Sequence, residues 1–141
     1  MTELLPTQLA WAAGFIEGEG CIRLYVHTRG GAWKLRVTVG STNVLQVKQL
    51  HEYFGGSFYP RKSTFGKHTK PQWCWEVSTR SAEEVLRAIE PYIVGKKEEV
   101  RLGLLSRQYI AKYGPRKPDR IKLAEIDAAL RLEKKRVFTT G

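Results

Sequence analysis

The sequence has few cysteines, and it has no long apolar run. Only two of its 141 residues are cysteines, Cys21 and Cys74. They stand too far apart for a CxxC motif, so we expect two free thiols in a reducing compartment, with neither a zinc site nor a disulfide framework. No apolar stretch approaches the about 20 residues that a membrane span needs, and the M-T-E-L-L-P start does not resemble a signal peptide. We therefore expect a soluble intracellular protein without a membrane partner.

Acidic residues are also scarce, with 14 Asp or Glu against 24 Lys or Arg and a net charge of +10. The imbalance is concentrated between residues 21 and 80, where ten basic side chains stand against two acids, Glu52 and Glu76. A surface with charge of one sign favours a polyanion, and nucleic acid is the first candidate. A surface that only keeps a protein soluble usually mixes both signs.

Small residues recur along residues 10–20, which read A-W-A-A-G-F-I-E-G-E-G. Ala10, Gly14 and Gly18 are spaced four residues apart, so they lie along one face of a helix. A face without large side chains lets a second backbone approach closely, as small residues do between membrane helices. The spacing therefore predicts a tight helix pair.

Two carboxylates, Glu17 and Glu19, stand at the end of this helix, and no Lys or Arg occurs in residues 1–22. A carboxylate at a helix C-terminus is disfavoured by about 0.3–1 kcal/mol because the helix dipole is negative there. A divalent cation is the natural compensation for such oxygens. The segment thus indicates a two-fold axis with a metal-binding centre on it.

The periodicity of the chain predicts helices and hairpins in alternation. We expect a first helix over Thr7–Gly18 capped by Thr7, followed by strands at Cys21–His27 and Trp33–Val39. A second helix over Asn43–Phe54 is followed by strands at Ser57–Lys62 and Gln72–Thr79. Three more helices follow: one opened by a Ser81 capping box, one from about Lys96 to Tyr113, and a last one over Arg120–Arg136 capped by Asp119. This order predicts an α+β fold. Its antiparallel, saddle-like sheet would carry helices on one face and basic side chains on the other, which could lie in a DNA groove.

Residues 12–20, A-A-G-F-I-E-G-E-G, resemble the LAGLIDADG motif of homing endonucleases. The match covers the small-residue pair, the glycine, the apolar pair and the acid-Gly-acid-Gly ending. The resemblance implies the αββαββα fold, which agrees with the predicted order over about residues 7–113. We expect a core at residues 1–113 and a basic helical extension, residues 114–141, packed on the same domain. A single motif implies a homodimer, whose interface we expect at Ala10, Ala13, Gly14, Glu17 and Gly18.

The resemblance also assigns the candidate active site. It places Mg²⁺, with Mn²⁺ as a possible substitute, on Glu19, and Gly18 is the further position at the metal. Such a cation activates water and stabilises charge on the scissile phosphate. Lys96 follows P-Y-I-V-G, where the family usually carries a basic residue that stabilises the phosphate charge; its neighbour Lys97 is the alternative. Asn43 is the third catalytic candidate, as an organiser of solvent around the metal.

The two predicted hairpins carry the candidate DNA-binding side chains. Arginine can pair with guanine through two hydrogen bonds, and lysine more often meets phosphate. The candidates on the first hairpin are Arg23, Tyr25, His27, Arg29, Lys34, Arg36 and Thr38, and those on the second are Arg61, Lys62, Lys67, His68 and Lys70.

The sequence therefore predicts a site-specific DNA endonuclease. It would cleave both strands of a long, near-palindromic duplex by metal-assisted hydrolysis, leaving 3′ overhangs. The main rival is a protein of the same fold that binds without cleaving, either an intron RNA maturase or a DNA-binding regulator. A basic RNA-binding accessory protein would explain the charge and not the motif.

Overall fold

The computed structural model describes residues 3–26, 32–61, 71–113 and 120–139. The elements in chain order are α1 (Pro6–Glu19), β1 (Gly20–Val26), β2 (Trp33–Ser41), α2 (Val44–Phe54), β3 (Ser57–Arg61), β4 (Gln72–Ser78), α3 (Thr79–Ile89), the 3₁₀ helix η1 (Glu90–Tyr92), α4 (Lys97–Tyr113) and α5 (Arg120–Thr139). The predicted α+β order of helices and hairpins is confirmed. No helix in the described ranges is long and apolar enough to cross a membrane.

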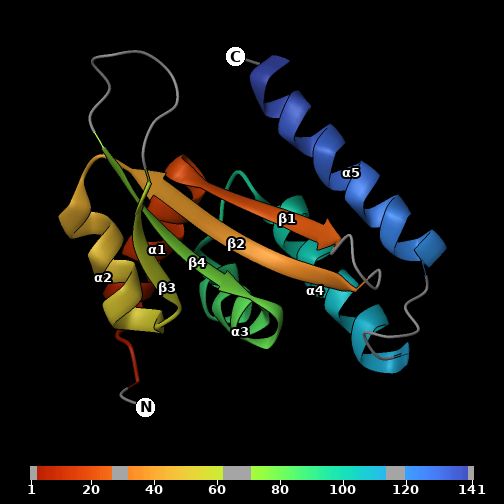
Figure 1. Ribbon diagram of the computed structural model, residues 1–141, viewed down its shortest axis with the longest axis horizontal. Helices are drawn as coiled ribbons and strands as arrows, with labels where there is room; N and C mark the ends of the chain where they lie inside the picture. Colours follow the sequence, from red (N-terminus) through yellow and green to blue (C-terminus); the bar gives the residue numbers. More distant parts are fainter. Residues whose placement is uncertain (1–2, 27–31, 62–70, 114–119, 140–141) are drawn as a thin grey trace.

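The four strands form one antiparallel sheet in the order β1-β2-β4-β3, so the two hairpins meet through β2 and β4. Alternating side chains of the three longer strands, such as Ile22, Val37 and Trp75, are buried against the helices. Figure 1 shows α1, α2, α3 and α4 on the same side of this sheet. The opposite face, here called the open face, is left to polar side chains.

The last helix packs along the edge of the sheet. α5 contacts α4 and the edge strand β1. Its Leu123, Ile126 and Leu130 are buried in the same core as the strands. α5 therefore extends the domain beyond β1.

Two predicted helix starts are wrong. α1 begins at Pro6, and its first turn is closed by the Gln8 side chain, whose Oε1 accepts a hydrogen bond from the Leu5 N–H at 2.8 Å; Thr7 is not the cap. α3 begins at Thr79, because the chain turns into the helix directly after β4 with Thr79 at a positive φ of 55°. Ser81 consequently lies within the first turn. The proposed cap Asp119 falls outside the described residues.

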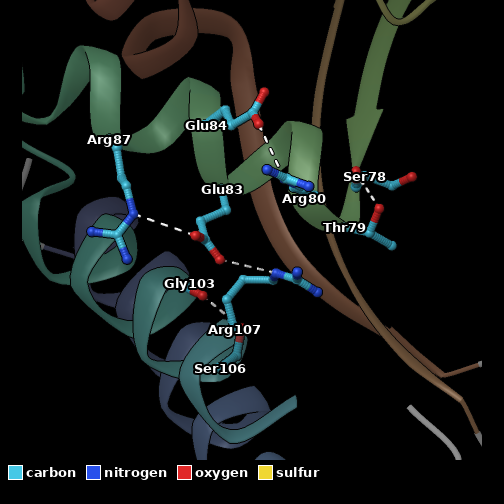
Figure 2. Close-up of polar contacts among 9 residues, drawn as sticks. All are labelled: Ser78, Thr79, Arg80, Glu83, Glu84, Arg87, Gly103, Ser106 and Arg107. Carbon is cyan, nitrogen blue, oxygen red and sulfur yellow. Dashed lines mark hydrogen bonds and ion pairs between the residues drawn. The ribbon is translucent and has the colours of Figure 1, made fainter. Parts of the chain in front are cut away.

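Helices α3 and α4 pack against each other through an ion-pair cluster and a close approach at a glycine. Glu83 on α3 accepts from Arg87 Nε at 3.4 Å and from Arg107 Nε on α4 at 3.2 Å (Figure 2). Gly103 on α4 allows the helix to approach closely, since a Cβ there would lie 3.0 Å from Leu86 and 3.2 Å from Leu35. The middle of α4 is therefore packed closely against α3 and the sheet.

Candidate functional site

α1 has two distinct faces. Ala12, Ala13 and Ile16 are fully buried in the core. Gly14 and Gly18 are exposed on the other face, and a Cβ built on either would meet nothing within 4 Å. With the exposed Ala10 they form a smooth surface, here called the α1 stripe. Ala13 was expected in the dimer interface, but its side chain is buried in the chain's own core and is not exposed on this stripe.

Glu19 ends α1 next to this stripe. Its side chain is exposed, and it makes no hydrogen bond or ion pair with any other described residue. The helix passes straight into β1 at Gly20, where a Cβ would lie only 2.5 Å from the Ile16 carbonyl oxygen. Glycine at this position lets the strand leave the helix without a loop, which fixes Glu19 at the helix–strand junction.

A pocket at the end of α1, here called the α1-end pocket, collects residues from three parts of the chain. It is lined by Glu17, Gly18, Glu19, Gly20, Cys21, Lys96, Glu99 and Lys134. Lys96 precedes α4 and donates a hydrogen bond from Nζ to the Gly20 carbonyl oxygen at 2.7 Å. Lys97 is exposed and lies outside this pocket. The fold therefore brings Lys96, and not Lys97, beside Glu19.

Two residues of the α1-end pocket were missed by the sequence reasoning. Glu99 is a buried carboxylate on α4, and this burial raises its pKa above the usual range, although Lys96 acts in the opposite direction. Lys134 comes from α5, and its Nζ lies 3.7 Å from Cys21 Sγ. Nothing in the local sequence indicates that α5 runs back along β1, so no signal could have found Lys134.

Asn43 is not brought to the α1-end pocket. It is the N-cap of α2, where its Oδ1 accepts a hydrogen bond from the Gln46 N–H at 3.3 Å. An asparagine at this position stabilises a helix start in the ordinary way. That capping role accounts for Asn43 without a part in chemistry.

The open face of the sheet contains a hollow of about 550 Å³. Five of the expected DNA-binding residues line it: Arg23, Tyr25, Arg36, Thr38 and Arg61. Lys34 is exposed on β2 outside it, whereas His27, Arg29, Lys62, Lys67, His68 and Lys70 fall outside the described residues. Tyr59, Asp127 and Arg131 also line the hollow and were not expected. The hollow thus reaches from β3 across the sheet to α5.

One arginine that lines this hollow is already oriented by its neighbours. The Arg36 guanidinium lies 4.3 Å from the centroid of the Tyr25 ring, and its Nε lies 3.4 Å from the Glu76 carboxylate. Ring and carboxylate fix the direction of the side chain and leave it only partly exposed. Nearby, burial and the charge of Glu76 raise the pKa of the Tyr59 phenol above its usual range.

No protein-family model matches the sequence, and no curated protein matches it. Solved structures do match. The homing endonuclease I-CvuI in complex with its target superposes with a TM-score of 0.70 at 20% identity, over 90% of this chain and 82% of that one. The archaeal intron-encoded homing endonuclease I-Vdi141I, complexed with DNA, superposes with a TM-score of 0.69 at 13% identity, over 90% of this chain and 84% of that one. The I-LtrWI LAGLIDADG homing endonuclease, bound to target DNA, superposes with a TM-score of 0.67 at 20% identity, over 90% of this chain and 45% of that one.

The chain has the LAGLIDADG homing-endonuclease fold. Within this fold, the residues that resemble the motif form the second half of α1 and the first residue of β1. The two motif acids have different surroundings. The carboxylate of Glu17 accepts hydrogen bonds from the main-chain N–H groups of Val94 and Gly95, whereas that of Glu19 is left open.

Few side chains of one copy of this chain could bind a metal ion at the α1-end pocket. Across the residues that the structure describes, no three His, Cys, Asp or Glu side chains are grouped so that they could hold an ion. The open carboxylate of Glu19 is the kind of hard oxygen donor that Mg²⁺ accepts alongside water and phosphate oxygens. The Glu19 carboxylate therefore fits one ligand position of a divalent cation.

Proposed function

We propose that this protein is a site-specific DNA endonuclease that acts as a homodimer. One observation carries the proposal: an uncommitted carboxylate, Glu19, and a lysine ammonium, Lys96, meet in one pocket at the end of a smooth, exposed helix face. Helix packing alone would require the glycines and not the acid. Phosphodiester hydrolysis requires both an oxygen donor for a cation and a positive group near the phosphate.

The DNA would lie on the open face. Arginines from β1, β2 and β3 line the hollow there, namely Arg23, Arg36 and Arg61. Arginine side chains on a pleated surface suit both phosphate oxygens and guanine edges in a major groove. The structural neighbours I-CvuI, I-Vdi141I and I-LtrWI were each solved with DNA, which supports this choice of partner.

Two copies of the chain would pair through the α1 stripe. Gly14 and Gly18 have open space where a Cβ would stand, so a second helix can approach them closely. The chain covers 43–45% of the neighbours I-AabMI, I-GzeII and I-LtrWI, so each of those chains is about twice as long as the part that matches. A dimer of this chain would reach a similar size. The target would then be long and near-palindromic, because the DNA-binding dimer has two-fold symmetry.

At the junction between the two copies, Glu19 from each chain would hold Mg²⁺, or Mn²⁺ in its place, with Gly18 beside it. A bound divalent cation supplies an activated water and stabilises charge on the scissile phosphate. Lys96 would face that phosphate and stabilise the charge that develops on it. Each chain would support the cleavage of one strand, and the two cuts would be staggered to leave 3′ overhangs.

A second function has a specific observation in its favour. The Lys96 ammonium is already bonded to the Gly20 carbonyl oxygen, and Asn43 is committed to capping α2. A chain in which these groups stay committed would bind a nucleic acid without cutting it. The partner would then be a DNA operator or a structured intron RNA.

Cleavage of a randomised duplex library with Mg²⁺ separates these functions. Wild-type protein, Glu19→Gln and the control Glu3→Gln would be compared, since Glu3 is an exposed acid ahead of α1. Cuts at one long, nearly symmetric sequence that vanish in Glu19→Gln and persist in Glu3→Gln are expected. Enrichment of a bound sequence without cuts in any of the three proteins would contradict cleavage, and the selection would be repeated with structured RNA.

A further inference from the structure

The segment that carries Lys96 is a short connection between η1 and α4. Ile93 is buried at its start, whereas Val94 is 80% exposed. Its ends are held by main-chain bonds, from the Ile93 N–H to the Glu90 carbonyl oxygen and from the Val100 N–H to the Lys96 carbonyl oxygen. Its middle is held by a different contact, to a side chain 77 residues away.

That side chain is Glu17. Its Oε1 accepts a hydrogen bond from the Val94 N–H, and its Oε2 accepts one from the Gly95 N–H at 3.0 Å. Both oxygens of one carboxylate are therefore used by consecutive amides of the segment. Hydrogen bonds to an ionised acceptor are stronger than those between neutral groups, so this contact orders an otherwise exposed backbone.

The next residue of the segment returns to the same helix end. Lys96 Nζ donates to the Gly20 carbonyl oxygen at 2.7 Å, so the segment meets α1 and β1 at Glu17 and again at Gly20. Glu19 lies between these two points in the chain. The position of the Lys96 ammonium relative to Glu19 thus depends on where the backbone of the segment is held.

We propose that Glu17 is a positioning residue, which holds residues 94 and 95 so that the Lys96 ammonium lies beside Glu19. The role rests on the proposed function only where Lys96 acts on a phosphate; the contact itself can be tested without cleavage. A carboxylate is required because two N–H donors need two acceptor oxygens. Glutamine offers one oxygen, and its NH₂ group would oppose the second N–H.

The first experiment measures amide hydrogen exchange at Val94 and Gly95 by NMR in the wild type, Glu17→Gln and Glu17→Asp. Glu17→Gln should speed exchange at both amides by about tenfold or more, because a charged hydrogen bond is lost from an exposed segment. Glu17→Asp keeps both acceptors on a shorter arm and should give an intermediate result. Glu19→Gln is the matched control, which should leave both amides unchanged.

The second experiment measures the chemical reactivity of the Lys96 ammonium, which reports whether its side chain is held at Gly20. Competitive acetylation with acetic anhydride, mapped by mass spectrometry, compares Lys96 with its exposed neighbour Lys97 in the same molecule. Loss of the Glu17 contact should raise the reactivity of Lys96 relative to Lys97 by several-fold, since the hydrogen bond to Gly20 loosens. A general loss of structure would also expose Lys96, so the ratio is compared only between proteins whose circular dichroism spectra match that of the wild type.

The third readout is the single-turnover cleavage rate at saturating DNA. Glu17→Gln should lower it by about 10–100-fold with DNA affinity retained, the loss expected when a reacting group is misplaced by about 1 Å. Unchanged exchange at Val94 and Gly95, an unchanged lysine ratio, or wild-type cleavage by a variant with loosened amides would each overturn the proposal. If the wild-type protein cuts no DNA, the proposed function fails, and exchange and acetylation still decide whether Glu17 holds the segment. If Glu17→Gln does not fold, Glu17→Asp serves for all three readouts.

Discussion

Replacing Gly14 by leucine should stabilise the monomer and weaken the dimer. Gly14 lies in the interior of α1, and a Cβ there meets nothing within 4 Å in a single chain. Leucine is a better helix former than glycine by nearly 1 kcal/mol. For a domain of this size the gain corresponds to roughly 3 °C in melting temperature, provided that the monomer is measured alone.

The same side chain would lie between the two copies of α1 in the proposed dimer. Overpacking a close contact costs about 1–3 kcal/mol per site, and a two-fold axis doubles it to about 2–6 kcal/mol. The dimer dissociation constant should therefore rise by roughly thirtyfold to twenty-thousandfold. One substitution thus shifts two observables in opposite directions, whereas a general loss of stability would weaken the monomer and the dimer together.

Sedimentation over a dilution series gives the dissociation constant, and urea denaturation below it gives the stability of the monomer. The matched control is Ala128→Leu, which adds an apolar side chain to an exposed position on α5. A Gly14→Leu protein that is folded and dimerises like the wild type would refute the assignment of the α1 stripe as the interface. A less stable monomer would show that the stripe is already covered within one chain.

Three further predictions concern the site and the core. Lys134→Ala should reduce the salt dependence of DNA binding by about one phosphate contact, measured by competition binding at several salt concentrations; an unchanged slope would place Lys134 away from the DNA. Glu99→Gln should raise the melting temperature at pH 7. The pKa of Glu99 in the folded protein is raised from the usual 4.5, so the carboxyl group favours folding when protonated and loses that contribution as the pH rises through the folded pKa. The gain should vanish at pH 4, and a loss at pH 7 would contradict it. Trp75→Phe should cost about 1–3 kcal/mol of unfolding free energy in urea, because Nε1 donates to the Gly55 carbonyl oxygen at 2.8 Å; a cost no larger than that of Trp73→Phe on the same strand would argue against this bond.

Much of the fold follows from local patterns in the sequence. The alternation in β1 and β2 placed Ile22 and Leu35 inward, and arginines such as Arg23 and Arg36 outward, because side chains of a strand alternate between its two faces. Helix starts were less predictable. The start of α3 moved from Ser81 to Thr79, since the backbone turns at the end of β4 through a positive φ that no residue pattern announced.

The candidate site likewise depends partly on local sequence patterns and partly on tertiary contacts. The sequence by itself determined the acids Glu17 and Glu19, the small-residue spacing of α1 and the excess of basic residues on the hairpins, because each depends on residues that are neighbours in a helix or strand. Only the tertiary structure decided that Lys96 and not Lys97 enters the α1-end pocket, and that Lys134 joins it from α5. It also gave the two acids different surroundings: Glu17 accepts hydrogen bonds from the amides of Val94 and Gly95, whereas the Glu19 carboxylate is left open. These contacts join residues up to 113 positions apart, and which of them form depends on how α1, α4 and α5 pack around β1.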